Sequence, residues 1–225
     1  MDKLIFVGGS KGGTGKSTVC GATLDYLIQQ KKKPLLIESD GTNPDVWKAY
    51  KDSCDNIVLN LDEAEGWIEL INVADKTKGR PVVINTAARN SAGVERYGET
   101  LRSTLKELNR ELTTLWVINR QRDSLELLAD YLDALPEGQV HVIRNTYWGE
   151  SQKFEMYNGS TVKKRIDAAG GKSLDFPDLA DRVSDALVGK RLTIEAAVRE
   201  LPIGDRAELL RWRAATARVL GEVLG

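Results

Sequence analysis

Residues 4–18 read LIFVGGSKGGTGKST. An apolar run ends at Val7, a glycine-rich segment follows, and an amphipathic stretch opens at Lys16, which predicts the order strand, loop, helix. Glycines leave backbone N–H groups free to surround phosphate oxygens, and the N-terminus of a helix adds positive charge at the same place. The segment is therefore predicted to bind nucleotide phosphates through Gly12, Gly13, Thr14, Gly15, Lys16, Ser17 and Thr18.

Two side chains of this loop have predicted chemical roles. Lys16 is expected to reach the terminal phosphates, and the Ser17 hydroxyl is expected to bind Mg²⁺. The strict pattern G-x-x-x-x-G-K-[ST] would place its first glycine at position 10, where this chain has Ser10. An alternative interpretation is a glycine-rich turn without a ligand, but three glycines and two lysines between a strand and a helix favour phosphate binding.

The second lysine of the loop is Lys11, directly before the glycine pair. The segment Lys11-Gly12-Gly13-Thr14-Gly15-Lys16-Ser17 resembles the deviant Walker A loop of the ParA/MinD family of ATPases. The resemblance implies a P-loop NTPase fold with ATP and Mg²⁺ as cofactors. It also implies an ATP-dependent homodimer, in which Lys11 reaches the nucleotide of the partner subunit. Lys11 and Lys16 are therefore predicted to be catalytic, because they neutralise phosphate charge.

Composition limits the class of protein. The chain has 225 residues, 41% of them hydrophobic, so we expect a single domain over residues 1–225 with 178–225 as a helical C-terminal segment packed on it. The net charge of −1 argues against electrostatic binding of DNA or anionic lipid over the whole protein surface. Cys20 and Cys54 lack metal-ligand spacing, and no leader pattern or long apolar run is present. We expect a cytoplasmic protein without a membrane span.

Short apolar runs alternate with helical patterns along the chain. The runs are 4–7, 35–37, 57–59, 82–84, 115–118 and 140–143. This rhythm predicts an α/β fold with a doubly wound, mostly parallel sheet and helices on both faces. One helix face is predicted at Leu101, Leu105, Leu108 and Leu112, and another at Leu125, Leu128, Leu132 and Leu135. Residues 150–175 are predicted to form a long, partly irregular excursion.

The second apolar run is followed by acidic residues, in the sequence Glu38-Ser39-Asp40. Ligands of doubly wound sheets gather at the carboxyl ends of strands. The segment resembles the family's switch region, which implies that Asp40 positions the attacking water near the γ-phosphate and Mg²⁺. Glu38 stands where relatives more often carry another aspartate. The alternative is that residues 40–45 simply form a turn or a helix cap.

The fourth run ends at Asn85, where the family keeps the Walker B aspartate that orients Mg²⁺ through a water. An amide oxygen can accept a hydrogen bond from that water, but it carries no charge and cannot act as a base. The metal site is thus predicted to be Ser17, Asp40 and Asn85, and hydrolysis is predicted to be slow. Restoring the aspartate by Asn85→Asp is expected to raise turnover.

The sixth run ends at Asn145. The resemblance implies that this side chain reads the adenine base, since an amide can donate and accept at once. Without the resemblance, a turn-forming asparagine is the simpler interpretation. His141 lies inside the same apolar run, and it is the single histidine of the chain, so a metal role is not expected.

A looser resemblance links the chain to ParA-like proteins of conjugative and mobilisable plasmids, the StbB type among them. It lies in the sequences of residues 145–149, 153–158 and 174–183. This implies a dimerising switch in plasmid partition, stability or conjugative transfer, beside a plasmid-encoded protein partner. The alternatives are a nucleotide-dependent scaffold with little hydrolysis and a small-molecule ligase on the same fold. Arginines at 206, 211, 213 and 218 permit a non-specific DNA contact, although ordinary packing is favoured and membrane docking is not. Trp212 suits a core or interface position better than a lipid anchor.

Overall fold

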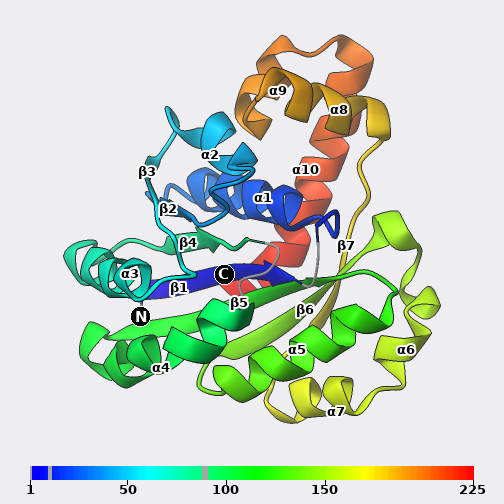
Figure 1. Ribbon diagram of the computed structural model, residues 1–225. Helices are drawn as coiled ribbons and strands as arrows, with labels where there is room; N and C mark the ends of the chain where they lie inside the picture. The colour runs from blue at the N-terminus through cyan, green and yellow to red at the C-terminus, as the bar shows by residue number, and fades with distance from the viewer. Residues whose placement is uncertain (1, 10–11, 88–90) are drawn as a thin grey trace.

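The computed structural model describes residues 2–9, 12–87 and 91–225. Its centre is a 7-stranded sheet in the order β3-β2-β4-β1-β5-β6-β7, with every pair of neighbouring strands parallel (Figure 1). The strands are β1 (Asp2–Gly9), β2 (Leu35–Glu38), β3 (Asp55–Val58), β4 (Val82–Asn85), β5 (Arg110–Ile118), β6 (Gln139–Asn145) and β7 (Ser173–Phe176). The predicted parallel sheet is confirmed.

Helices cover both faces of the sheet (Figure 1). One layer contains α1 (Lys16–Gln29), α2 (Asp45–Tyr50), α8 (Asp181–Lys190), α9 (Ile194–Glu200) and α10 (Ile203–Leu224). The other contains α3 (Ala64–Lys76), α4 (Ser91–Leu108), α5 (Arg122–Ala134), α6 (Glu155–Asn158) and α7 (Thr161–Ala168). Alternate residues of β1 feed the two cores, Ile5 and Val7 on one side and Leu4 and Phe6 on the other. The doubly wound architecture is therefore confirmed.

One predicted helix position belongs to a strand. Helix α4 ends at Leu108, and Leu112 lies in β5, which begins five residues earlier than the apolar run suggests. Asn109 has a φ of 52°, a left-handed conformation that asparagine tolerates and that stops a helix. Leu112 is nevertheless buried in the same core as Leu101 and Leu108. The leucine spacing indicated burial correctly but assigned the wrong element.

The predicted irregular excursion over residues 150–175 contains more structure than expected. After the short 3-10 turns Thr146–Trp148 and Ser151–Lys153 come α6, α7 and the edge strand β7. Strand β7 has only four residues, of which Leu174 and Phe176 are buried. So short an alternation is not distinguishable from a loop in the sequence.

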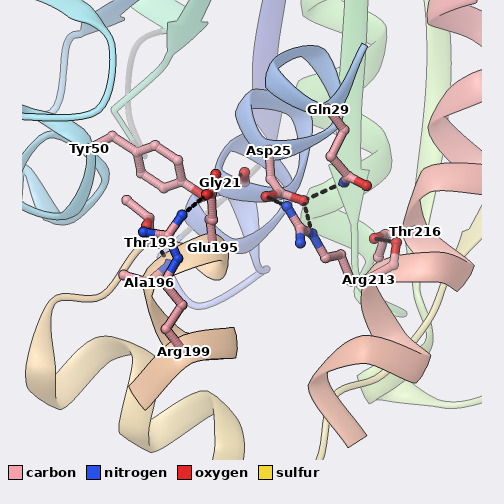
Figure 2. A network of polar contacts seen from close by, with 10 residues as sticks. All are labelled: Gly21, Asp25, Gln29, Tyr50, Thr193, Glu195, Ala196, Arg199, Arg213 and Thr216. Atoms are coloured by element: carbon pink, nitrogen blue, oxygen red, sulfur yellow. Dashed lines mark hydrogen bonds and ion pairs between the residues drawn. The ribbon is translucent and has the colours of Figure 1, made fainter. Parts of the chain in front are cut away.

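The C-terminal helix α10 packs along α1, the helix that follows the glycine-rich loop. Arg213 of α10 donates two hydrogen bonds, of 2.8 and 2.7 Å, to the Asp25 carboxylate of α1, and Gln29 donates a third to the same carboxylate at 2.7 Å. Figure 2 shows this cluster beside Tyr50 of α2, whose hydroxyl donates to the Gly21 carbonyl at 3.0 Å. Helix α1 is thus held from two sides.

Trp212 confirms the expected core position on α10. Its side chain is buried, its indole N–H donates to the Pro177 carbonyl at 2.8 Å, and its ring packs edge-on against Phe176. Two of the four arginines of this helix are already paired, Arg213 with Asp25 and Arg211 with Glu208. Over the described residues, no helix has the length and apolar character to cross a bilayer.

The buried ion pair gives a first prediction. Because the Asp25 and Arg213 side chains are only 6% and 17% exposed, Arg213→Ala leaves a buried carboxylate with a single amide donor. We expect the free energy of unfolding to fall by about 3 kcal/mol in urea titrations. Arg218→Ala, at an exposed position of the same helix, is the control and should change it by less than about 0.5 kcal/mol. Equal losses in the two variants would remove the structural role assigned to the pair.

Candidate functional site

The site lies where three neighbouring strands end. In the order β2-β4-β1, Glu38 stands opposite Asn85, and Asn85 stands opposite Val7. Strand β1 continues two residues beyond Val7 and ends at Gly9, directly before the glycine-rich loop. The loop, the segment after β2 and the end of β4 therefore meet at one edge of the sheet, as predicted for the phosphate site.

The backbone of the loop requires its glycines. Gly13 and Gly15 have φ of 80° and 102°, in the left-handed region that side chains rarely adopt. A Cβ atom on Gly9 would lie 2.6 Å from the Val117 carbonyl oxygen, and one on Gly15 would lie 2.4 Å from Asn145 Nδ2. Gly15 is also the N-cap of α1 and has no side chain to cap the first turn, so those N–H groups can face an anion.

The residues predicted to contact phosphate differ in solvent exposure. Thr14 and Lys16 are buried, whereas Gly12, Gly13, Ser17 and Thr18 are exposed. Ser10 and Lys11 lie outside the described residues, so the prediction for Lys11 rests on the sequence. Ser17 is an exposed residue on the first turn of α1, directly after the loop.

Lys16 and Asp40 lie close enough to interact electrostatically. Burial lowers the pKa of Lys16, and the negative charge of Asp40 partly offsets this effect. The Asp40 Oδ1 atom accepts from the backbone N–H groups of Thr42 and Asn43, at 3.2 and 3.0 Å. The turn proposed as the alternative role of Asp40 therefore exists. It uses only one carboxylate oxygen, so a turn and a role in catalysis are compatible.

Glu38 joins the site, although the sequence did not single it out as a site residue. Its side chain is fully buried and accepts from Asn85 Nδ2 at 2.9 Å and from the Asp40 N–H at 3.0 Å, both on Oε1. Burial raises the pKa of Glu38 to about 7. The signal that could have found it was its position, where relatives more often carry an aspartate.

Asn85 shows an incomplete set of hydrogen bonds. It is 2% exposed, and its amide nitrogen donates to Glu38. Its Oδ1 atom has no hydrogen-bond partner among the described residues. Buried polar atoms are nearly always paired, so an unpaired acceptor at this edge indicates a ligand or water that supplies a donor.

A hollow beside the loop is suited to the rest of a nucleotide. It is lined by Gly13, Gly15 and Thr18, by Asn145 and Tyr147 at the end of β6, and by residues 176–179 at the end of β7. The sequence analysis did not predict the last segment as part of the site, because its sequence showed only a loose likeness to plasmid-encoded relatives. Trp212 holds it in place through the Pro177 carbonyl.

Asn145 connects this hollow to the loop. Its Nδ2 atom donates to the Thr14 carbonyl at 2.9 Å, and its Oδ1 atom accepts from the Tyr147 N–H at 3.2 Å. An amide side chain has two N–H donors and two lone pairs. Asn145 therefore has one N–H donor and one lone pair left for a ligand. Its predicted contact with adenine stays a prediction.

The residues present fit Mg²⁺ better than a metal held by protein ligands alone. No cluster of three or more His, Cys, Asp or Glu side chains occurs among residues 2–9, 12–87 and 91–225. Mg²⁺ in nucleotide sites uses one or two protein oxygens together with phosphates and waters. The oxygens of Ser17 and Asp40 are of this kind, and the Asn85 oxygen can accept from a metal-bound water. His141 is buried, accepts from the Lys172 N–H, and has its pKa lowered to about 4 by burial, consistent with a structural role.

Solved structures share the fold of this chain. The MinD cell division protein of Aquifex aeolicus superposes with a TM-score of 0.58 at 14% identity, covering 99% of this chain and 98% of that one. The MinD protein of Pyrococcus horikoshii OT3, complexed with Mg-ADP, gives 0.57 at 17% identity, covering 100% and 98%. At these identities the likeness shows the fold alone.

Sequence relatives extend over the whole chain. Protein MobD of Acidithiobacillus ferrooxidans is 58% identical over 225 residues, which cover 100% of this chain and 99% of that protein. Protein TraL of Escherichia coli is 25% identical over 217 residues, covering 89% and 88%. The family profile named CobQ/CobB/MinD/ParA nucleotide binding domain matches residues 5–147, which include the loop, Asp40, Asn85 and Asn145. The chain belongs to this CobQ/CobB/MinD/ParA family of nucleotide-binding domains.

Proposed function

We propose that this protein is an ATP-dependent dimerising switch with slow, Mg²⁺-dependent ATPase activity, working in plasmid partition, stability or conjugative DNA transfer. The observation that carries the proposal is the meeting of Lys16, Asp40 and Asn85 beside the glycine-rich loop, at adjoining ends of β1, β2 and β4. We further propose that residues 1–225 act as one ATPase domain in the cytoplasm.

Each residue has a proposed role in binding and hydrolysis. The loop N–H groups and Lys16 hold the phosphates, and charge neutralisation is most of what phosphoryl transfer needs from a protein. Asp40 orients the attacking water. Ser17, Asp40 and Asn85 hold Mg²⁺, which when bound neutralises charge that develops on the phosphates. Asn145 and the hollow after β7 receive the adenine.

Dimerisation is proposed to follow ATP binding. Lys11 adds positive charge to the nucleotide of the partner subunit, so two copies associate only when ATP is present. Hydrolysis and phosphate release remove the contacts that favour the pair, and the subunits separate. The names of the relatives MobD and TraL agree with a mobilisation and transfer setting, in which a plasmid-encoded protein or non-specific DNA contacts the switch.

Slow turnover is the expected enzymatic behaviour. Because Asn85 supplies neither a charge nor a base, we expect kcat below about 1 s⁻¹, the low end for enzymes. The measurement is phosphate release at saturating ATP and Mg²⁺, with and without DNA. Lys16→Ala prepared in the same way measures contaminating ATPase. Rapid hydrolysis without DNA, absent from that control, would contradict the role given to Asn85.

One alternative is favoured by a specific observation. The amide at position 85 also suits a scaffold that binds ATP and a protein partner but scarcely hydrolyses the nucleotide. Turnover indistinguishable from the Lys16→Ala background, in a protein that still binds ATP, would select this scaffold.

A further inference from the structure

Glu38 and Asn85 form a buried hydrogen-bonded pair at the ends of neighbouring strands. They stand opposite each other in the β2–β4 register, and the Asn85 Nδ2 to Glu38 Oε1 distance is 2.9 Å. A carboxylate accepts hydrogen bonds, so it fixes which end of the amide faces it. Asn85 is therefore held with its nitrogen toward Glu38 and its oxygen directed elsewhere.

This orientation leaves Asn85 Oδ1 buried and without a hydrogen-bond partner among the described residues. An unpaired buried acceptor is energetically unfavourable, and a donor that binds there removes that cost. The protein keeps this acceptor at the edge where Lys16, Asp40 and the loop converge. A water bound to Mg²⁺ is a strong donor and is the ligand that this position calls for.

Glu38 also connects Asn85 to the segment after β2. The oxygen that accepts from Asn85 also accepts from the Asp40 N–H at 3.0 Å, while Oε2 accepts from the Trp47 N–H at 3.3 Å. One buried carboxylate thus holds the end of β4, the backbone of Asp40 and the start of α2. Movement of Asn85 toward a ligand would be transmitted through Glu38 to Asp40.

We propose that Glu38 and Asn85 jointly replace a single metal-orienting carboxylate. Asn85 Oδ1 accepts from the metal-bound water, and Glu38 is the positioning residue that fixes the amide and, in its ionised form, places a negative charge beside it. This inference rests on the proposed nucleotide-binding function and deepens it, because it explains how the site can manage Mg²⁺ with an amide at position 85.

The pair also changes what to expect from Asn85→Asp. The new carboxylate would stand against Glu38 without a donor between them, and two carboxylates that close cannot both ionise freely. The increase in turnover expected from the sequence should therefore not appear in the single variant. It requires the exchange of both groups, Glu38→Gln together with Asn85→Asp, which keeps one carboxylate and one amide in contact.

The test measures how much Mg²⁺ strengthens nucleotide binding. The Kd of the non-hydrolysable analogue adenosine 5′-(β,γ-imido)triphosphate is determined by calorimetry in EDTA and in Mg²⁺. We expect Glu38→Gln to reduce the ratio of the two constants at least about tenfold, the usual effect of losing a group that supports a metal ligand. The Kd in EDTA should change by less than about threefold.

The double variant separates charge exchange from simple damage. Glu38→Gln/Asn85→Asp should restore the ratio to within about threefold of the wild-type value, whereas a structural role for Glu38 predicts no recovery. Glu63→Gln, an exposed carboxylate at the start of α3, is the matched control and should leave the ratio unchanged. If Glu38→Gln fails to fold, Asn85→Ala carries the test with the same expected loss.

The outcomes distinguish this inference from the proposed function. A normal ratio in Glu38→Gln, or a double variant no better than the single ones, overturns the role of Glu38 while ATP binding stands. A wild-type protein that binds no nucleotide under either condition overturns both.

Discussion

Lys16→Ala is expected to weaken ATP binding at least about 100-fold, a loss of about 2.7 kcal/mol. Charge-assisted hydrogen bonds from a lysine to phosphate are among the strongest that proteins make. In the free protein the Lys16 ammonium is buried, and burial lowers its pKa, so removing the charge relieves a desolvation cost that offsets part of the packing lost with the side chain. Calorimetric titration of ATP with Mg²⁺ measures the affinity, and urea unfolding measures the stability.

The matched control for this variant is Lys33→Ala. Lys33 is exposed in the segment between α1 and β2, so its removal takes away the same charge at a distance from the loop. We expect its ATP affinity to stay within about twofold of the wild-type value. Equal affinities in the Lys16 and Lys33 variants would mean that the loop does not hold phosphate through Lys16.

Lys11→Ala is expected to abolish ATP-dependent dimerisation while nucleotide binding is largely kept. The lysine is proposed to act on the partner subunit's phosphates, so its loss removes an attraction that exists only between subunits. We expect the dimer to weaken at least about tenfold, with ATP affinity of the monomer changed less than about threefold. Light scattering with ATP, at several protein concentrations, measures the first quantity, and calorimetry measures the second.

The same Lys33→Ala variant controls for the loss of a positive charge, and it should dimerise normally. A Lys11→Ala protein whose ATP-dependent dimer is unaltered would refute the cross-subunit role. A variant that loses nucleotide binding and dimerisation together would instead place Lys11 in its own subunit's site.

The fold was predictable because its signals are local. Apolar runs such as 4–7 and 82–84 are buried on both faces, so they stand out against the amphipathic helices. Where tertiary context decides, the sequence was insufficient. Asn109 ends α4 through a left-handed conformation that many asparagines do not adopt, and β7 exists because β6 offers it a pairing edge.

The candidate site was predictable where its residues follow a motif. The loop glycines, Lys16 and Asp40 sit at fixed positions relative to strand ends, and the structure brings them together. The pairing of Glu38 with Asn85 was not predictable, because the two residues are 47 positions apart in the sequence and the contact depends on β2 and β4 being neighbours. The contribution of residues 176–179 to the hollow was not predictable either, because it depends on the end of β7 lying beside the glycine-rich loop.

The most direct measurement of the central claim is calorimetric titration of the wild-type protein with ATP in the presence of Mg²⁺. We expect saturable binding of one nucleotide per chain, with a Kd on the order of micromolar. Absence of binding at millimolar ATP and Mg²⁺ would contradict the proposed function, because the glycine-rich loop would then not bind the phosphates of ATP.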